Sequence, residues 1–98
     1  MHTVNASLQL IPLTSASEAM EHIDQAIALI RESGLRYEVT AFDTQVEGSM
    51  EQILALISRI YTMNGFRPGQ DVLLQIKMHW RAGESVFMDQ KTAAHRIV

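Results

Sequence analysis

Apolar and polar residues alternate from Val4 to Ile11, near the start of the chain. A period of two gives a β-strand one apolar and one polar face, so this segment is predicted to be a half-buried strand. Pro12 ends it, because proline has no N–H to donate to a neighbouring strand. The apolar face consists of Val4, Ala6, Leu8 and Leu10, and the polar face of Asn5, Ser7 and Gln9.

Two later segments follow the period of a helix. The first is predicted from about Ser17 to Ser33, with Ser15 as its candidate N-cap and Gly34 in the left-handed position after its end. The second begins after the candidate N-cap Ser49 and ends before residues 64–65. Its predicted buried stripe comprises Ile53, Leu56, Ile57 and Ile60, widened by Leu54 and Tyr61.

Strand-forming residues return in the remaining segments. Residues 37–42 and 44–47 are predicted to form a hairpin with Asp43 at its turn, and residues 71–80 form the last clear strand. The tail, residues 86–98, is weakly amphipathic, which is compatible with a short terminal helix. This order predicts a single α/β (α+β) domain over residues 1–98. Its fold class is ferredoxin-like β-α-β-β-α-β, with a four-stranded antiparallel sheet and two helices on one face.

The opposite face of that sheet is left uncovered in this arrangement. Antiparallel sheets often expose one face to water, but such a face usually carries more lysine and glutamate than this one. A ligand site or a subunit contact is therefore the competing interpretation. The predicted members are Asn5, Ser7, Gln9, Glu38, Thr40, Gln75 and Lys77, with Gln45 or Glu47 depending on register, and the apolar Phe42 and Leu73.

Composition narrows the possible functions. The 98 residues contain no cysteine, which excludes disulfides, thiolate catalysis and cysteine-bound zinc. The net charge of −3 is unlike the basic footprint of nucleic-acid-binding proteins, so we expect no nucleic-acid partner. No apolar run approaches the about 20 residues needed to cross a bilayer. We therefore expect no membrane partner and a cytoplasmic location.

Motifs for catalysis or metal binding are absent from the sequence. The four histidines have no metal-ligand spacing, and no glycine-rich phosphate loop or nucleophile elbow is present. Glu38 and Glu47 could meet across the hairpin, where paired carboxylates serve acid–base catalysis, bind an amine, or simply pair with Lys77. We expect no catalytic residue, no metal and no enzyme activity, because no nucleophile, base and oxyanion site come together.

Three segments in order resemble the thiamine-binding protein family (YkoF-like proteins). They are Ser7-Leu8-Gln9-Leu10-Ile11-Pro12, Ser33-Gly34-Leu35-Arg36-Tyr37-Glu38-Val39 and Thr44-Gln45-Val46-Glu47-Gly48, and the strand at 72–77 also fits. The resemblance implies a ferredoxin-like subunit that binds thiamine or its hydroxymethylpyrimidine part, has no other cofactor, and forms homo-dimers or tetramers. By matched position it implies ligand contacts from Ser7, Tyr37, Glu38, Thr44 and Glu47.

Phe42 joins this candidate ligand-binding set because an aromatic ring can stack on a heterocycle. Trp80 is a second candidate for stacking, or else a packing or oligomer residue. Tyr37 has a competing role in the core, Thr44 in the turn and Glu47 at a strand end. The hairpin rim departs from the family pattern, since Thr40-Ala41 and Phe42-Asp43 replace a Gly-Pro and a small or amide-bearing pair. The alternative function is a regulatory or assembly module whose sheet face is only a subunit interface.

Overall fold

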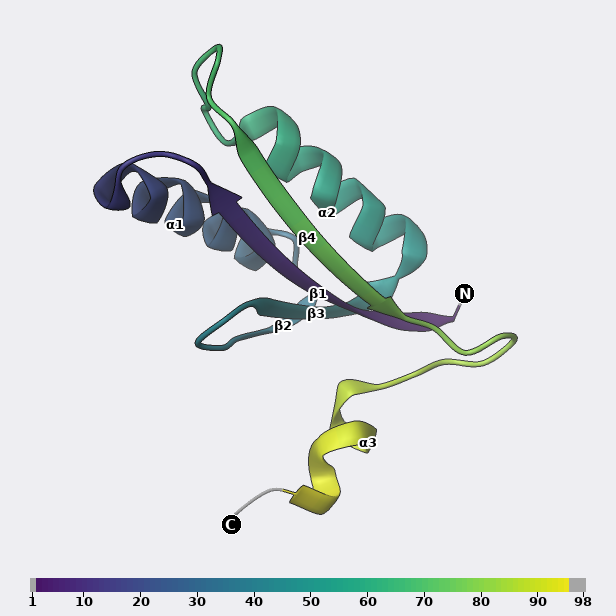
Figure 1. Cartoon of the computed structure of the whole chain (residues 1–98). Helices are drawn as coiled ribbons and strands as arrows, with labels where there is room; N and C mark the ends of the chain where they lie inside the picture. The colour runs from purple at the N-terminus through teal and green to yellow at the C-terminus, as the bar shows by residue number, and fades with distance from the viewer. Residues whose placement is uncertain (1, 96–98) are drawn as a thin grey trace.

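The alternating N-terminal segment forms β1 (Thr3–Pro12), which lies inside a four-stranded antiparallel sheet in the computed structural model. The structure describes residues 2–95. β1 pairs with β3 (Thr44–Ser49) on one side and β4 (Val72–His79) on the other, and β2 (Arg36–Val39) pairs with β3. The strand order is therefore β2-β3-β1-β4. Figure 1 shows β4 at one edge of the sheet and the β2–β3 hairpin at the other.

Helices connect these strands as predicted. α1 (Ala16–Glu32) joins β1 to β2, and α2 (Met50–Met63) joins β3 to β4. The Ser15 hydroxyl accepts a hydrogen bond from the N–H of Glu18, which confirms the predicted cap. Ser49 and Gln52 form a complete capping box at the start of α2. Serine caps therefore fix where both helices begin.

The core lies between the sheet and these two helices. The apolar face of β1 packs there as predicted, together with Val46 of β3, which is fully buried. α1 contributes Ala26, Leu29 and Ile30, and α2 contributes Ile53, Leu56 and Ile60. The prediction that Leu54 and Tyr61 widen the buried stripe of α2 is wrong: they are 53% and 85% exposed. They lie on a part of α2 that is exposed to solvent.

The tail forms a short helix, with which its weak amphipathicity is compatible. After β4 the chain turns through residues 80–87 and forms α3 (Met88–Thr92) and a 3₁₀ turn (Ala93–His95). α3 lies apart from α1 and α2 in Figure 1, and its contacts are with the polar face of the sheet. Residues 96–98 of the predicted tail lie outside the described residues. None of the described helices is long and apolar enough to span a membrane.

The hairpin differs from its prediction in one respect. β2 ends at Val39, not at residue 42, because residues 40–43 form a turn. The Thr40 N–H donates to the Asp43 carbonyl at 2.9 Å, and the Thr40 hydroxyl accepts from the N–H groups of Phe42 and Asp43. Thr40 and Phe42 therefore do not continue the strand face that begins at Glu38.

Candidate functional site

The polar face of the sheet is organised as two transverse rows, each with one residue from every strand. The cross-strand pairs place Glu38, Gln45, Ser7 and Lys77 in the first, which we call the open row. They place Arg36, Glu47, Asn5 and His79 in the second, which we call the covered row. Directly opposite residues on neighbouring strands share a face, so all eight point away from α1 and α2. The predicted open face is thus present, and both Gln45 and Glu47 belong to it.

Every residue of the covered row contacts the C-terminal segment. The Arg36 guanidinium lies 2.6 Å from the Asp89 carboxylate, and the Glu47 carboxylate accepts a 2.6 Å hydrogen bond from the Met88 N–H. Two further contacts follow the same pattern. Asn5 Nδ2 donates to the Val86 carbonyl at 3.0 Å, and Lys91 Nζ lies 2.9 Å from His79 Nδ1. The covered row is therefore the surface on which α3 docks.

Docking of α3 creates a pocket over the open row. The pocket has a volume of about 290 Å³, close to the lower end of the range for small-molecule sites. Its walls come from elements far apart in the sequence. The lining residues are Asn5, Ala6, Ser7, Glu38, Asp43, Gln45, Lys77 and His79 of the sheet and hairpin, and Met88, Asp89, Lys91 and Thr92 of α3.

Asn5 brings an unsatisfied acceptor to this pocket. The residue is only 5% exposed, and its Nδ2 donates to the Val86 carbonyl and, at 3.4 Å, to Glu47 Oε1. Its Oδ1 is buried and accepts no hydrogen bond within residues 2–95. Buried polar atoms are nearly always paired, so this unpaired acceptor is an exception within the described part of the chain.

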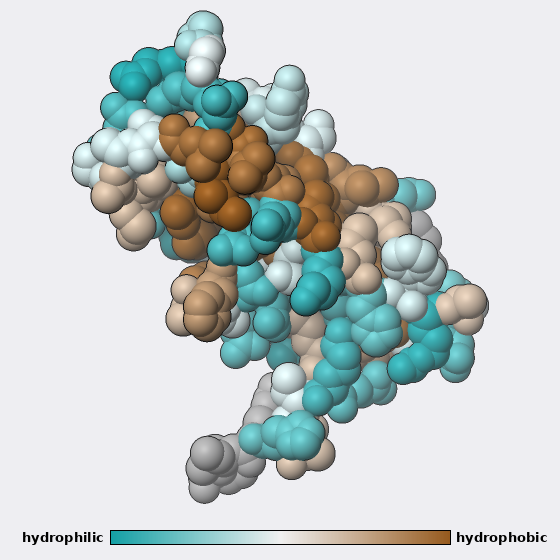
Figure 2. Space-filling view, in the orientation of Figure 1, coloured by the Kyte–Doolittle hydropathy of each residue, from teal (hydrophilic) through white to brown (hydrophobic). Residues whose placement is uncertain are grey.

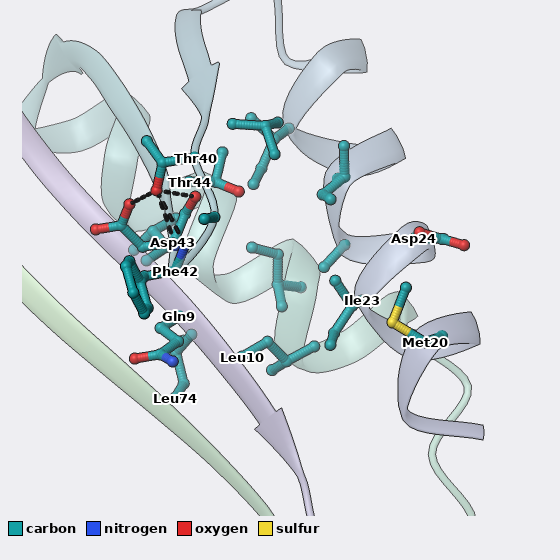
Figure 3. Close-up of a pocket in the computed structure, with 17 residues that line it drawn as sticks. Gln9, Leu10, Met20, Ile23, Asp24, Thr40, Phe42, Asp43, Thr44 and Leu74 are labelled. Carbon is teal, nitrogen blue, oxygen red and sulfur yellow. Dashed lines mark hydrogen bonds between the residues drawn. The ribbon is translucent and has the colours of Figure 1, made fainter. Parts of the chain in front are cut away.

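Asp43 lies at the other end of the pocket, held by two hydroxyl groups. Ser7 Oγ donates to Asp43 Oδ2, and Thr40 Oγ1 donates to Oδ1 at 2.6 Å. Figure 3 shows the Thr40–Asp43 contacts at the tip of the hairpin. The Ser7 and Thr40 hydrogen bonds, with a smaller contribution from the charge of Lys77, lower the pKa of this carboxyl below its usual range. Asp43 is therefore a carboxylate at neutral pH, and the Ser7 hydroxyl donates its proton to this carboxylate.

The hollow continues past Asp43 to Phe42. A second depression of about 440 Å³ is lined by Ser7, Asp43 and Lys77 as well as by Gln9, Phe42, Gln75 and Ile76. Phe42 is 83% exposed, so its ring is available to a ligand. The sequence placed Phe42 on the strand face. The structure corrects this: the residue lies in the turn, at the far end of a hollow that starts at α3.

Tyr37 and Thr44 are not on the open face. Tyr37 pairs with Val46 and packs against the core, and Thr44 is buried opposite Leu8. Both residues occupy the alternate positions of β2 and β3 and so face the core side, which agrees with the competing core role of Tyr37. Thr44 lines a largely apolar cavity of about 410 Å³ between the hairpin and α1, which Figure 3 shows with Met20 and Ile23 on its helix side.

Glu47 and Trp80 have other surroundings than the pocket. Glu47 belongs to the covered row, where its carboxylate contacts the backbone N–H of Met88 and the guanidinium of Arg36. Trp80 lines a separate depression beside His2 and Met50. Within residues 2–95, no group of three or more His, Asp or Glu side chains is placed to hold a metal ion. Of the six predicted ligand residues, the structure brings Ser7, Glu38 and Phe42 to the continuous hollow.

The protein is an α/β domain with a ferredoxin-like sheet and a small polar pocket on the open face of that sheet. The family model described as thiamine-binding protein matches residues 6–96, and the chain belongs to that family. The predicted resemblance is thereby confirmed.

Individual relatives agree with this assignment. A UPF0045 protein from Clostridium perfringens is 28% identical over 96 residues, which cover 98% of this chain and all of the relative. A Thermotoga maritima protein with a proposed role in thiamine biosynthesis or salvage has a TM-score of 0.86 and 27% identity, over 96% of this chain and 99% of its own. A domain of unknown function from Bacillus cereus has a TM-score of 0.84 and 29% identity, over 97% of this chain and 91% of its own.

Asn5, Gln45, Asp43 and Lys77 were missing from the predicted ligand set, although all line the pocket. The alternation of β1 and β4 already placed Asn5 and Lys77 on the polar face. The pairing register that puts Lys77 beside Ser7 was not visible in the sequence. The contribution of α3 had no sequence signal beyond the weak amphipathicity of the tail.

Proposed function

We propose that this protein binds thiamine or its hydroxymethylpyrimidine moiety in the open-face pocket, without catalysing a reaction and without another cofactor. Membership of the thiamine-binding protein family supports the ligand class. The observation that carries the proposal is the open-face pocket of about 290 Å³, whose wall includes the Glu38 carboxylate and the Gln45 amide. The exocyclic amine of an aminopyrimidine is a donor to such a carboxylate.

The other pocket residues suit the same ligand. The carboxylate of Glu38 accepts from an amine or lies beside the cationic thiazolium ring, and Phe42 offers a face on which a ring stacks. The side-chain amide of Gln45 can donate to a ring nitrogen. The nucleophile-and-base arrangement that an enzyme requires has no counterpart in this set.

Titration calorimetry of the full chain with thiamine and with free hydroxymethylpyrimidine tests the proposal. We expect saturable binding of at least one compound, weakened about tenfold by Glu38→Gln. Glu21→Gln, an exposed change on α1, is the matched control and should leave the affinity unchanged. The ligand should be recovered chemically unchanged after incubation. No heat with either compound at millimolar concentration overturns the binding proposal, and a new product overturns its non-catalytic part.

We also propose that the protein is a homo-oligomer assembled through the β4 edge. Within residues 2–95, β4 pairs with β1 alone, so its other edge has unpaired backbone groups. Figure 2 shows apolar residues gathered over β4 and α2, and polar residues over the lower part of the molecule. The exposed apolar residues of these two elements include Leu54 and Tyr61 of α2 and Ile76 of β4. A second copy that pairs β4 with β4 would extend the sheet, cover this surface and leave the polar pocket accessible.

A further inference from the structure

The two ends of the open row carry opposite charges. Glu38 lies on the outer strand β2 and Lys77 on the outer strand β4, with Gln45 and Ser7 between them. Among residues 2–95, neither Glu38 nor Lys77 forms a hydrogen bond or ion pair with another side chain. Neighbouring strands lie about 4.8 Å apart, so the row spans about 14 Å from backbone to backbone.

The cationic end of the pocket is larger than one lysine. Lys91 of α3 lines the same pocket, and its ammonium group contacts His79 Nδ1, the neighbour of Lys77 on the same face of β4. The anionic end is formed by Glu38, with Asp43 at the hairpin side. Two ammonium groups therefore line the β4 and α3 side of the pocket, and the Glu38 carboxylate lines the β2 side. The Asp89 carboxylate of α3 also lines the pocket, and it is held by the Arg36 guanidinium.

We propose that this pocket selects a ligand with an amine-bearing ring at one end and a phosphate group at the other, with Lys77 and Lys91 holding the phosphate. This inference rests on the proposed function and refines it: the preferred ligand is the phosphate ester of thiamine or of hydroxymethylpyrimidine. The amine end meets Glu38, and the phosphate end meets the two lysines.

Charge explains why the ester is preferred. An unphosphorylated ligand offers no anion to Lys77 and Lys91, and the thiazolium cation of thiamine is repelled when it approaches these lysines. A phosphate provides two negative charges and several acceptor oxygens for charge-assisted hydrogen bonds to ammonium groups. Asp43 repels a phosphate, so the phosphate must lie on the β4 and α3 side of the pocket. Ser7 is not a donor to the phosphate, since its hydroxyl proton is bonded to Asp43.

Titration calorimetry of the full chain with thiamine, thiamine monophosphate, hydroxymethylpyrimidine phosphate and inorganic phosphate tests the inference. We expect a phosphate ester to bind at least tenfold more tightly than its unphosphorylated parent. Lys77→Gln should abolish that preference by weakening the binding of the ester. The control Arg59→Gln removes a cation from α2, away from the polar face, and should keep the preference.

The outcomes separate the two proposals. Parent compounds that bind as tightly as their esters, or a Lys77→Gln variant that still prefers the esters, overturn the inference and leave the proposed function intact. Inorganic phosphate that binds as tightly as the esters also overturns it, because the pocket would then be a plain anion site. Binding of the esters without measurable binding of their parents supports the inference. Binding of none of the compounds overturns both proposals.

Discussion

The Glu47 carboxylate caps α3 from across the molecule, with 2.6 Å between its Oε1 and the backbone nitrogen of Met88. Phe87, the residue at the N-cap of α3, provides no side-chain hydrogen bond of its own. A carboxylate is favourable at the start of a helix because it pairs with free N–H groups there. Glu47 also lies 3.6 Å from Arg36, which in turn binds Asp89. One strand residue therefore organises the attachment of the C-terminal segment.

Replacement of Glu47 should release α3 from the sheet. We expect Glu47→Ala to lower the free energy of unfolding by about 1–3 kcal/mol, since it removes a hydrogen bond to a charged group at a mostly buried site. Amide hydrogen exchange should accelerate over residues 86–92 more than in α1 or α2. Glu21→Ala, an exposed helix change, is the control. Unchanged exchange in this segment would show that α3 is held by the burial of Val86 and Met88 alone.

The hydroxyl groups around Asp43 make the hairpin sensitive to acid. Donation by Ser7 and then Thr40 lowers the pKa of this carboxyl in the folded state, below the value of about 3.9 expected in the unfolded chain. A lowered pKa contributes stability that is complete above about pH 4 and is lost as the pH falls through the folded-state pKa. The wild type should therefore lose more stability than Asp43→Asn between pH 6 and about pH 2.5.

Urea denaturation at several pH values measures this difference. Ser7→Ala should reduce the acid-dependent loss, because it removes the largest cause of the lowered pKa. Gln9→Ala, on the same face of β1, is the control. Parallel stability curves for the wild type and Asp43→Asn would mean that the hydroxyl groups do not favour the ionised form.

Asn64 should be among the residues most costly to truncate. Its side chain is fully buried at the end of α2, where Oδ1 lies 2.8 Å from His22 Nδ1 and Nδ2 donates to the His22 carbonyl at 3.2 Å. The His22 ring also stacks on Phe66, with the ring centroids 4.0 Å apart. Asn64→Ala removes both side-chain contacts with the half-buried His22 and leaves its Nδ1 only the Asn64 backbone carbonyl at 3.2 Å, so we expect a loss of about 1–3 kcal/mol in thermal or urea unfolding.

His22→Phe tests the same contact from the other side. It retains the aromatic stack and removes the ring nitrogen, so its effect should be smaller than that of Asn64→Ala. If both variants lost a similar free energy of unfolding, the contribution of this contact would come from side-chain packing and not from the hydrogen bond. His2→Phe, at an exposed position near the N-terminus, is the control.

Local patterns predicted the parts of this fold that local forces determine. Alternation located β1 and β4, and serine caps located the starts of both long helices. Phe42 was misplaced because the Thr40–Asp43 hydrogen bonds end β2 early, and side-chain hydrogen bonds in a turn leave no periodic signal. The pocket was harder still. Asn5 and Glu47 reach the backbone of residues 86 and 88, more than forty positions away, and no spacing in the sequence encodes such contacts.

The β4 edge and the polar face can be compared directly as subunit interfaces. Ile76, which is 44% exposed, lies on the apolar side of β4, and its neighbour Gln75 lies on the polar face of the same strand. If copies assemble through the β4 edge, Ile76→Lys places a charge in an apolar contact and should reduce the oligomer to monomers, whereas Gln75→Lys should not. Light scattering gives the mass of each species, and circular dichroism establishes that both variants fold. If Gln75→Lys dissociates the oligomer and Ile76→Lys does not, the polar face is the interface instead. Assembly would then cover the open row, so ligand binding should weaken as the oligomer forms.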